Sequence, residues 1–212
     1  MYAFRALGLE DGEVPDDSVP EMARRYVEEL LGFQPEGPYL LGGHSSGGVI
    51  AYEIAGQLLA RGHVVERVIQ VDTVTVEQSH RLGVRNMHDA VRLVESFEDV
   101  SSELAGSLLV AMRSDPRLGE VILATNKALA LYHPARHAVP LVYLRASERD
   151  PVLDPHADAW WRAQTAGGFE VHDVPGNHFS VMEDPHVAAV ARVLRERLDA
   201  RRPEVAPLRG VA

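Results

Sequence analysis

A serine between glycines is the residue of this chain whose surroundings best fit covalent chemistry. Ser45 lies after the apolar residues 39–41 and before an apolar, helix-like stretch over 49–61, in the segment Gly43-His44-Ser45-Ser46-Gly47. A Gly-x-Ser-x-Gly turn between a strand and a helix places the hydroxyl at the end of a sheet, beside the free N–H groups of the first helical turn. The glycines permit a turn so tight that a Cβ would clash with neighbouring backbone. We therefore predict that Ser45 is a nucleophile.

A serine hydroxyl needs a general base, and His178 is the best candidate in the sequence. It follows the apolar stretch 169–174, in the turn-like segment Pro175-Gly176-Asn177-His178-Phe179. A histidine, whose ordinary pKa is near ~6.5, can take the serine proton at neutral pH and later return it. We predict that His178 is this base. The neighbouring His44 is expected to pack elsewhere, since adjacent side chains on so tight a turn point apart.

A carboxylate is expected behind the base, because it fixes the tautomer of the imidazole and stabilises the imidazolium that forms. Two aspartates follow predicted strands. Asp72 ends the apolar run 68–71, and Asp150 follows the apolar run 141–144. Either one gives the chain order Ser, Asp, His that is typical of α/β hydrolases. We predict that Asp72 is the acid, with Asp150 as the alternative.

Composition and charge narrow the classes of function. The chain has 212 residues, no cysteine and a net charge of −10, from 21 Lys and Arg against 31 Asp and Glu. The negative charge argues against non-specific binding to nucleic acid. Ten histidines are scattered without metal-binding spacing, so we expect no metal and no cofactor. No apolar run reaches the ~18 residues of a membrane span, and no signal peptide is evident, so a cytoplasmic protein is expected.

The spacing of apolar residues predicts alternating strands and helices. Strands are expected at 2–5, 39–41, 68–71, 141–144 and 169–174. Helices are expected at about 18–31, 49–61, 155–164 and 187–198, with three more in an insertion over 77–132, near 84–97, 102–112 and 118–131. This order implies a mostly parallel sheet with helices on both faces, whose functional residues gather at the carboxyl ends of the strands. We expect one domain over 1–200 and a disordered tail over 201–212.

Six segments together form a more specific pattern. They are Gln34-Pro35-Glu36-Gly37-Pro38-Tyr39-Leu40-Leu41-Gly42-Gly43-His44-Ser45, Ala51-Tyr52-Glu53-Ile54-Ala55, Leu59-Ala60-Arg61-Gly62-His63, Val71-Asp72, Val174-Pro175-Gly176-Asn177-His178-Phe179 and Glu183-Asp184-Pro185-His186-Val187. This pattern resembles the thioesterase domains of polyketide synthases and nonribosomal peptide synthetases, over about residues 2–198. The resemblance implies an α/β-hydrolase fold in which the insertion over 77–132 is a helical lid.

The resemblance also implies a reaction and a partner. Ser45 would attack an acyl thioester held on the phosphopantetheine arm of an acyl or peptidyl carrier protein, and the acyl chain would leave by hydrolysis or by ring closure. In chain-terminating members the acid follows the strand after the elbow, as Asp72 does. In stand-alone editing thioesterases it follows a later strand, as Asp150 does. Residues expected to line a lid pocket are Leu109, Met112, Ile122 and Leu129, and those expected to meet the carrier are Arg113, Arg117 and Arg136.

One departure from the family pattern leaves other functions open. Family members usually begin with a further strand and a Pro-Gly-Gly-like loop, which supplies one N–H of the oxyanion hole. This sequence starts after that strand and loop. We expect the backbone N–H of Ser46 to be one oxyanion donor, and no second donor is identified. The alternatives to a chain-releasing thioesterase are therefore an editing thioesterase, an esterase for small oxygen esters, and an inactive domain or docking module.

Overall fold

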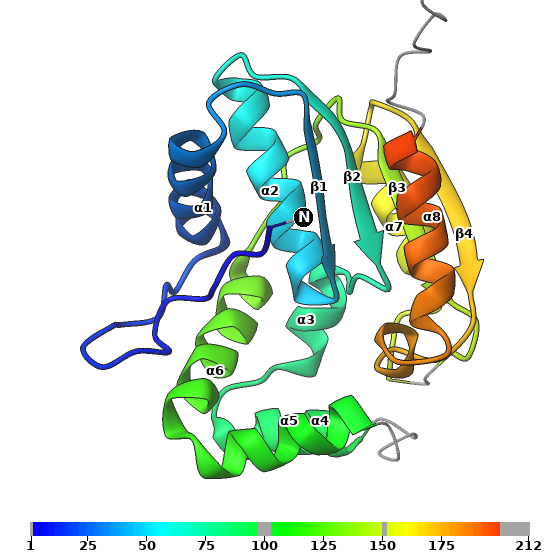
Figure 1. Ribbon diagram of the computed structural model, residues 1–212. Coiled ribbons are helices and arrows are strands. Elements are labelled where there is room, and N and C mark those ends of the chain that lie inside the picture. The colour runs from blue at the N-terminus through cyan, green and yellow to red at the C-terminus, as the bar shows by residue number, and fades with distance from the viewer. Residues whose placement is uncertain (1, 97–102, 150–151, 200–212) are drawn as a thin grey trace, which may run out of the picture.

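The computed structural model of the protein describes residues 2–96, 103–149 and 152–199. Its centre is a sheet of four parallel strands that follow one another in the order of the sequence (Figure 1). The strands are β1 (Tyr39–His44), β2 (Val65–Val71), β3 (Leu141–Ala146) and β4 (Phe169–Val174). They correspond to four of the five predicted strands, so the parallel α/β sheet inferred from the sequence is confirmed.

The register of the sheet brings the carboxyl ends of its strands to one edge. His44 of β1 lies beside Val71 of β2, and Val71 lies near Leu144 of β3. Ala146, the last residue of β3, lies beside Val174, the last residue of β4. The residues that directly follow the strands therefore emerge at the same edge, where parallel α/β sheets bind their ligands.

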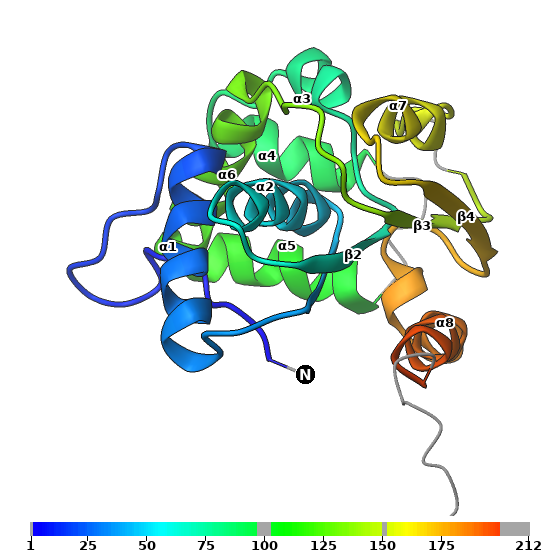
Figure 2. The ribbon, with the colours of Figure 1, turned by 90° about the horizontal axis from the view of Figure 1, so that it is seen from above.

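Helices cover both faces of the sheet, as the sequence predicted. They are α1 (Val19–Phe33), α2 (Ser46–Ala60), α7 (Ala157–Gln164) and α8 (Val187–Asp199). Seen from above, α2 and α7 lie on one face and α8 lies on the other (Figure 2). Because α2 is enclosed by the sheet, α1 and α6 (Pro116–Leu131), its side chains Val49, Tyr52 and Leu58 are completely buried.

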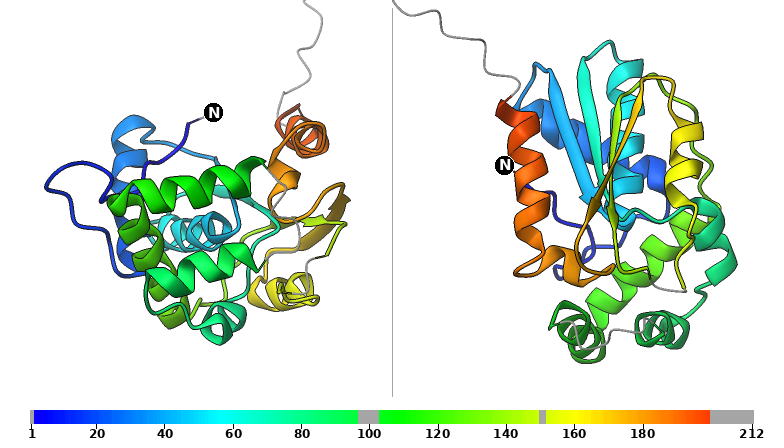
Figure 3. Two further views of the ribbon diagram at one scale, coloured as in Figure 1. Left: turned by 90° about the horizontal axis from the view of Figure 1, so that it is seen from below. Right: turned by 90° about the vertical axis from the view of Figure 1, so that its right-hand side faces the viewer.

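The described part of the insertion between β2 and β3 holds four helices. They are α3 (Val76–Leu82), α4 (Met87–Glu95), α5 (Glu103–Ser114) and α6. The green helices of this insertion lie across the end of the molecule at which the strands finish (Figure 3). Three helices were predicted here, and that count is wrong because α3 was missed. Thr75 begins α3 by accepting a hydrogen bond from the Gln78 N–H at 3.1 Å, and Gly83 ends it with a φ of +58°. With seven residues, α3 is too short for its sequence to show the repeat of apolar residues that is typical of a helix.

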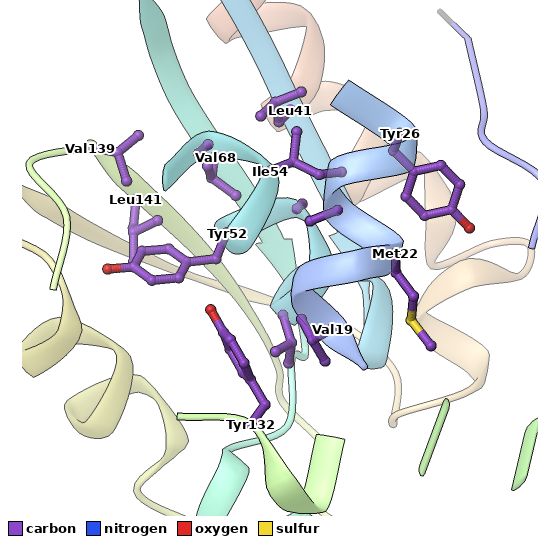
Figure 4. Close-up of a cluster of buried hydrophobic side chains, with 14 of the residues drawn as sticks. Val19, Met22, Tyr26, Leu41, Tyr52, Ile54, Val68, Tyr132, Val139 and Leu141 are labelled. Atoms are coloured by element: carbon purple, nitrogen blue, oxygen red, sulfur yellow. The ribbon is translucent and has the colours of Figure 1, made fainter. Parts of the chain in front are cut away.

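In the part of the chain that the structure describes, buried apolar side chains form three clusters. The largest lies between α1, α2 and one face of the sheet (Figure 4). Another lies between the opposite face and α8. The remaining cluster joins α4 and α5 to Leu153 and Phe179, which belong to the segments after β3 and β4. The insertion is therefore fastened by apolar contacts to the residue that directly follows His178.

The four residues expected to line a lid pocket lie in these clusters. Leu109 and Met112 are buried in the cluster of α4 and α5, and Ile122 packs against it. Leu129 belongs instead to the largest cluster, with the sheet and α2. Leu129 is thus separated from the other three, which share one cluster.

The hydroxyl of Tyr52 connects α2 to two segments that are distant in the sequence. It accepts a hydrogen bond from the His137 N–H at 2.9 Å. It also lies 2.6 Å from the carbonyl oxygen of Gln164 and 3.0 Å from that of Ala135, to either of which it can donate. The single hydroxyl thus holds together α2, the connection into β3 and the end of α7.

Residues 2–5 form no strand, contrary to the prediction. The ring of Phe4 packs against Tyr26 of α1, with 4.7 Å between ring centroids, and the Tyr26 hydroxyl donates to the carbonyl oxygen of Arg5 at 3.3 Å. A strand needs a hydrogen-bonded neighbour, and within the described ranges β1 pairs with β2 alone. The expected tail over 201–212 lies outside the described residues. None of the described helices is long and apolar enough to cross a bilayer.

Candidate active site

The turn that carries Ser45 lies between β1 and α2, as predicted. Its backbone is unusual, since Ser45 has a φ of +53° and a ψ of −124°. A Cβ built on Gly43 would lie 2.6 Å from the nitrogen of Gly48 and closer still to the carbonyl group of Gly47, so a glycine is required at position 43. A Cβ on Gly47 would meet nothing within 4 Å, and the expectation that both flanking glycines are needed for space is wrong at that position.

Gly48, one residue further along α2, is a second glycine at which the backbone leaves no room for a Cβ. A Cβ built on it would overlap the hydroxyl oxygen of Thr73 and lie 2.9 Å from both Cβ and Cγ2 of that residue. Thr73 is 1% exposed and directly follows Asp72. The glycine therefore lets the first turn of α2 approach the end of β2, which draws Ser45 and Asp72 together.

A chain of hydrogen bonds connects Ser45, His178 and Asp72. The Nε2 atom of His178 is 3.0 Å from the Ser45 Oγ, and its Nδ1 atom is 2.9 Å from the Oδ2 atom of Asp72. His178 is 4% exposed and Asp72 is 3% exposed. The three residues follow β1, β4 and β2, so the parallel strands bring all of them to one edge of the sheet. This arrangement can pass the serine proton to Nε2 while the carboxylate accepts the Nδ1–H group.

The carboxylate of Asp72 accepts hydrogen bonds at both of its oxygens. Besides His178 at Oδ2, its Oδ1 atom accepts hydrogen bonds from the Ala146 N–H and from Nη1 of Arg149, both at 3.2 Å. Burial acts to raise the pKa of Asp72, but the hydrogen bond from His178 and the charges of His178 and Arg149 outweigh it, so this pKa is lowered. The carboxylate is therefore ionised at neutral pH.

Asp150, the alternative acid, lies outside the described residues. Its neighbour Arg149 is described, and its contact with Asp72 was not anticipated. No sequence signal could have found that contact, because the two residues are far apart in the chain and an Arg–Asp pair at that separation has no characteristic spacing.

His44 contacts the segment that carries His178. Its Nε2 atom is 2.7 Å from the carbonyl oxygen of His178, and the two rings lie 4.8 Å apart. Burial, with a smaller contribution from the charge of His178, lowers the pKa of His44 to about 4. The ring is therefore neutral at pH 7, with its proton on Nε2, where it donates to the carbonyl. His44 is therefore not placed to act as the base for Ser45. Besides packing, it forms a hydrogen bond to the backbone of the residue that is the base.

The segment after β4 is fixed by its own side chains. The Asn177 Oδ1 atom accepts from the Phe179 N–H at 3.0 Å and from the Ser180 N–H at 2.9 Å. The Ser180 hydroxyl in turn accepts from the Asn177 N–H at 2.9 Å. Glu183, a few residues later, accepts a hydrogen bond from the backbone N–H of Leu104 in α5. The base is therefore held by a closed turn that is tied to the insertion.

Ser46, the expected oxyanion donor, is the first residue of α2. The N–H groups of a first helical turn have no acceptor within the helix, so its N–H is available at the elbow. Among the described residues no group of three or more His, Asp or Glu side chains is placed to hold a metal ion.

Comparison with known proteins agrees with this geometry. The family model of the thioesterase domain matches residues 1–198. The chain belongs to the thioesterase domain family. The fold of this thioesterase domain is accordingly that of the α/β hydrolases, as its solved neighbours also indicate.

The relatives of this thioesterase domain include parts of larger enzymes. An atromentin synthetase of Suillus grevillei is 28% identical over 237 residues, covering 95% of this chain and 24% of that protein. The chain thus spans about a quarter of the length of the curated relatives it matches.

Solved structures support the same assignment. A covalent complex of the NocB thioesterase domain with a fluorophosphonate nocardicin G analog is 30% identical, with a TM-score of 0.63 over 91% of this chain and 78% of that one. A structure of RedJ with a PEG molecule in its active site is 25% identical, with a TM-score of 0.70 over 90% of this chain and 78% of that one.

Proposed function

We propose that this thioesterase domain releases an acyl chain from the phosphopantetheine thioester of a carrier protein, through an acyl-serine intermediate. The observation that carries the proposal is the chain of hydrogen bonds from the Ser45 hydroxyl through His178 to Asp72. In this proposal Ser45 is the nucleophile, His178 the general base and Asp72 the acid that orients it. Membership of the thioesterase domain family supports a hydrolytic reaction of this kind.

The first half-reaction forms an ester on Ser45. The Oγ atom attacks the thioester carbonyl carbon while its proton moves to Nε2 of His178. The negative charge that develops on the carbonyl oxygen is stabilised by the Ser46 N–H and the positive end of the α2 dipole. When the carbon–sulfur bond breaks, His178 gives its proton to the leaving sulfur. The carrier protein then departs with a free thiol, and the acyl group remains on Ser45.

The second half-reaction removes the acyl group. His178 takes a proton from water, or from a hydroxyl or amine of the acyl chain itself, as that group attacks the ester carbon. The Ser45 oxygen leaves and recovers its proton from His178. Attack by water gives a free acid, and attack by an internal group gives a ring. The domain needs no cofactor of its own, because the phosphopantetheine arrives with the substrate.

The carrier protein as partner is supported by the relatives, which include a nonribosomal peptide synthetase of Aspergillus ustus. Three arginines were expected to meet this partner. Arg136 donates to the carbonyl oxygen of Thr165 at 3.3 Å, whereas the other two form ion pairs. Arg113 pairs with Glu95 at 2.6 Å and Arg117 pairs with Asp11 at 2.6 Å. Both charges are therefore already countered on the domain, and they are poor candidates for docking. We propose that the reaction takes place in the cytoplasm.

The proposal is tested by mass spectrometry of the intact domain after incubation with an acyl-pantetheine thioester. Wild-type protein should gain the mass of one acyl group, and Ser45→Ala should gain none. Ser46→Ala is the matched control, because it removes a hydroxyl from the same turn and keeps the backbone N–H. Acylation of Ser45→Ala at the wild-type rate would overturn the assignment of the nucleophile.

The same preparation separates the alternative functions. Faster turnover of matched oxygen esters than of thioesters would favour an esterase for small molecules. A wild-type domain that unfolds cooperatively but takes up no acyl group would favour an inactive domain or docking module. Analysis of the released product distinguishes a linear acid from a ring.

A further inference from the structure

Arg149 lies behind the carboxylate that supports the base, and its guanidinium is held at both ends. Its Nη1 atom donates to the Oδ1 atom of Asp72 at 3.2 Å, and its Nη2 atom donates to the carbonyl oxygen of Asp154 at 2.7 Å. The side chain is 29% exposed, whereas that of Asp72 is 2% exposed. Arg149 is therefore the link between a buried carboxylate and the protein surface.

The group that anchors Arg149 is itself fixed. The N–H of Asp154 donates to Oε1 of Gln78 at 3.1 Å, and Gln78 is a buried residue of α3. The Asp154 carboxylate lies 3.5 Å from the Thr75 hydroxyl, and 3.7 Å from the guanidinium of Arg81. Contacts with α3 and with the turn after β3 thus fix the position of Arg149.

We propose that Arg149 is a positioning residue for the release reaction, which holds the Asp72 carboxylate in the orientation that presents Oδ2 to His178. This inference rests on the proposed function. Apart from Arg149, the described donor to Oδ1 is the Ala146 N–H alone. Without the guanidinium the carboxylate would lose one of its two Oδ1 partners, and it could rotate away from the imidazole.

A matched arginine is available near the end of β3, four residues before Arg149. Arg145 of β3 is 32% exposed and forms ion pairs with Asp158 at 3.3 Å and Asp173 at 2.6 Å. It has a similar exposure and a similar kind of partner, but it does not contact Asp72. Its replacement by glutamine controls for the loss of a charged hydrogen-bonding side chain at this edge of the sheet.

The experiment measures acylation by an octanoyl-pantetheine thioester at pH 7, for wild type, Arg149→Gln, Arg149→Lys and Arg145→Gln. In Arg149→Gln we expect kcat to fall on the order of tenfold with KM unchanged, because one hydrogen bond to a charged group is lost. Arg149→Lys should recover only part of kcat, because a lysine cannot span both acceptors. Arg145→Gln should match wild type.

An Arg149→Gln variant with wild-type kcat and KM would overturn the inference, as would equal changes in Arg145→Gln. The proposed function is judged separately, from acylation of wild type that depends on Ser45. A second measurement needs no turnover: the proton between His178 Nδ1 and Asp72, followed by nuclear magnetic resonance, should change its chemical shift in Arg149→Gln and not in Arg145→Gln. An unchanged resonance in Arg149→Gln would refute the positioning role, even if the wild-type domain proved inactive.

Discussion

Replacement of Gly48 by alanine tests how the elbow and the acid are brought together. The added Cβ would overlap the hydroxyl oxygen of Thr73 and lie 2.9 Å from its Cβ and Cγ2. Thr73 has little room to retreat, because it is 1% exposed and its carbonyl oxygen accepts a hydrogen bond from Tyr143 at 2.9 Å. Overpacking of this kind costs about 1–3 kcal/mol. The better helix propensity of alanine returns at most about 1 kcal/mol.

We therefore expect Gly48→Ala to lower the free energy of unfolding by about 1–2 kcal/mol. Gly47→Ala is the matched control, because it lies one residue earlier in the same helical turn and its Cβ meets nothing within 4 Å. This variant should be as stable as wild type or more stable, by up to about 1 kcal/mol. Urea denaturation at pH 7 gives both values, provided that the slope with denaturant stays constant.

The clash with Thr73 can be tested directly by a double-mutant cycle. The Thr73 hydroxyl oxygen is buried and has no hydrogen-bond partner among the described residues, so Thr73→Ala removes atoms that satisfy no polar group. In the Gly48→Ala background, Thr73→Ala should recover part of the lost stability, and the two changes should not be additive. The rate of acylation should follow the same order, since Thr73 adjoins Asp72. Equal destabilisation by Gly47→Ala and Gly48→Ala, or additive effects in the cycle, would refute this reasoning.

Three further predictions concern His44 and Tyr52. His44→Leu should slow acylation more than His44→Gln, because only the amide can still donate to the carbonyl oxygen of His178; equal rates would contradict this. The pKa of His44 is lowered from 6.5 to about 4, so the unfolded chain binds an extra proton between these values, and stability should fall as pH drops from 6.5 to 4. Urea titrations should show a smaller fall in His44→Gln. Tyr52→Phe should cost about 2–3 kcal/mol in thermal or urea unfolding, since buried backbone groups lose a partner, whereas Tyr26→Phe, with one 3.3 Å bond, should cost less than half as much.

Local sequence signals predicted most of the fold because they act over a few residues. The apolar runs before Ser45 and His178 are strands, and α1 begins where Ser18 caps the N–H of Glu21 at 3.4 Å. Such signals fail where local preference and tertiary context differ. Residues 2–5 look like a strand, but in the described part of the chain they have no strand beside them and pack along α1 instead.

The three central residues of the candidate site could be predicted from the sequence. The residues that hydrogen-bond to them from elsewhere in the chain could not. Ser45, Asp72 and His178 each follow a strand, and the parallel order of strands brings them to one edge. The supporting contacts join residues that are distant along the chain: Arg149 with Asp72, and His44 with the carbonyl oxygen of His178. Contacts of this kind depend on how side chains meet after folding, and they leave no spacing in the sequence.

At Ser45 the backbone conformation that the reactive hydroxyl requires lowers the folding stability of the domain. A φ of +53° with a ψ of −124° is a conformation that glycine adopts freely and that costs other residues about 1–3 kcal/mol. Glycine at position 45 would thus make the domain harder to unfold while removing the hydroxyl that reacts. A laboratory selection for thermostability alone would therefore enrich glycine at this position. Each round of such a selection must also screen for acylation of the domain.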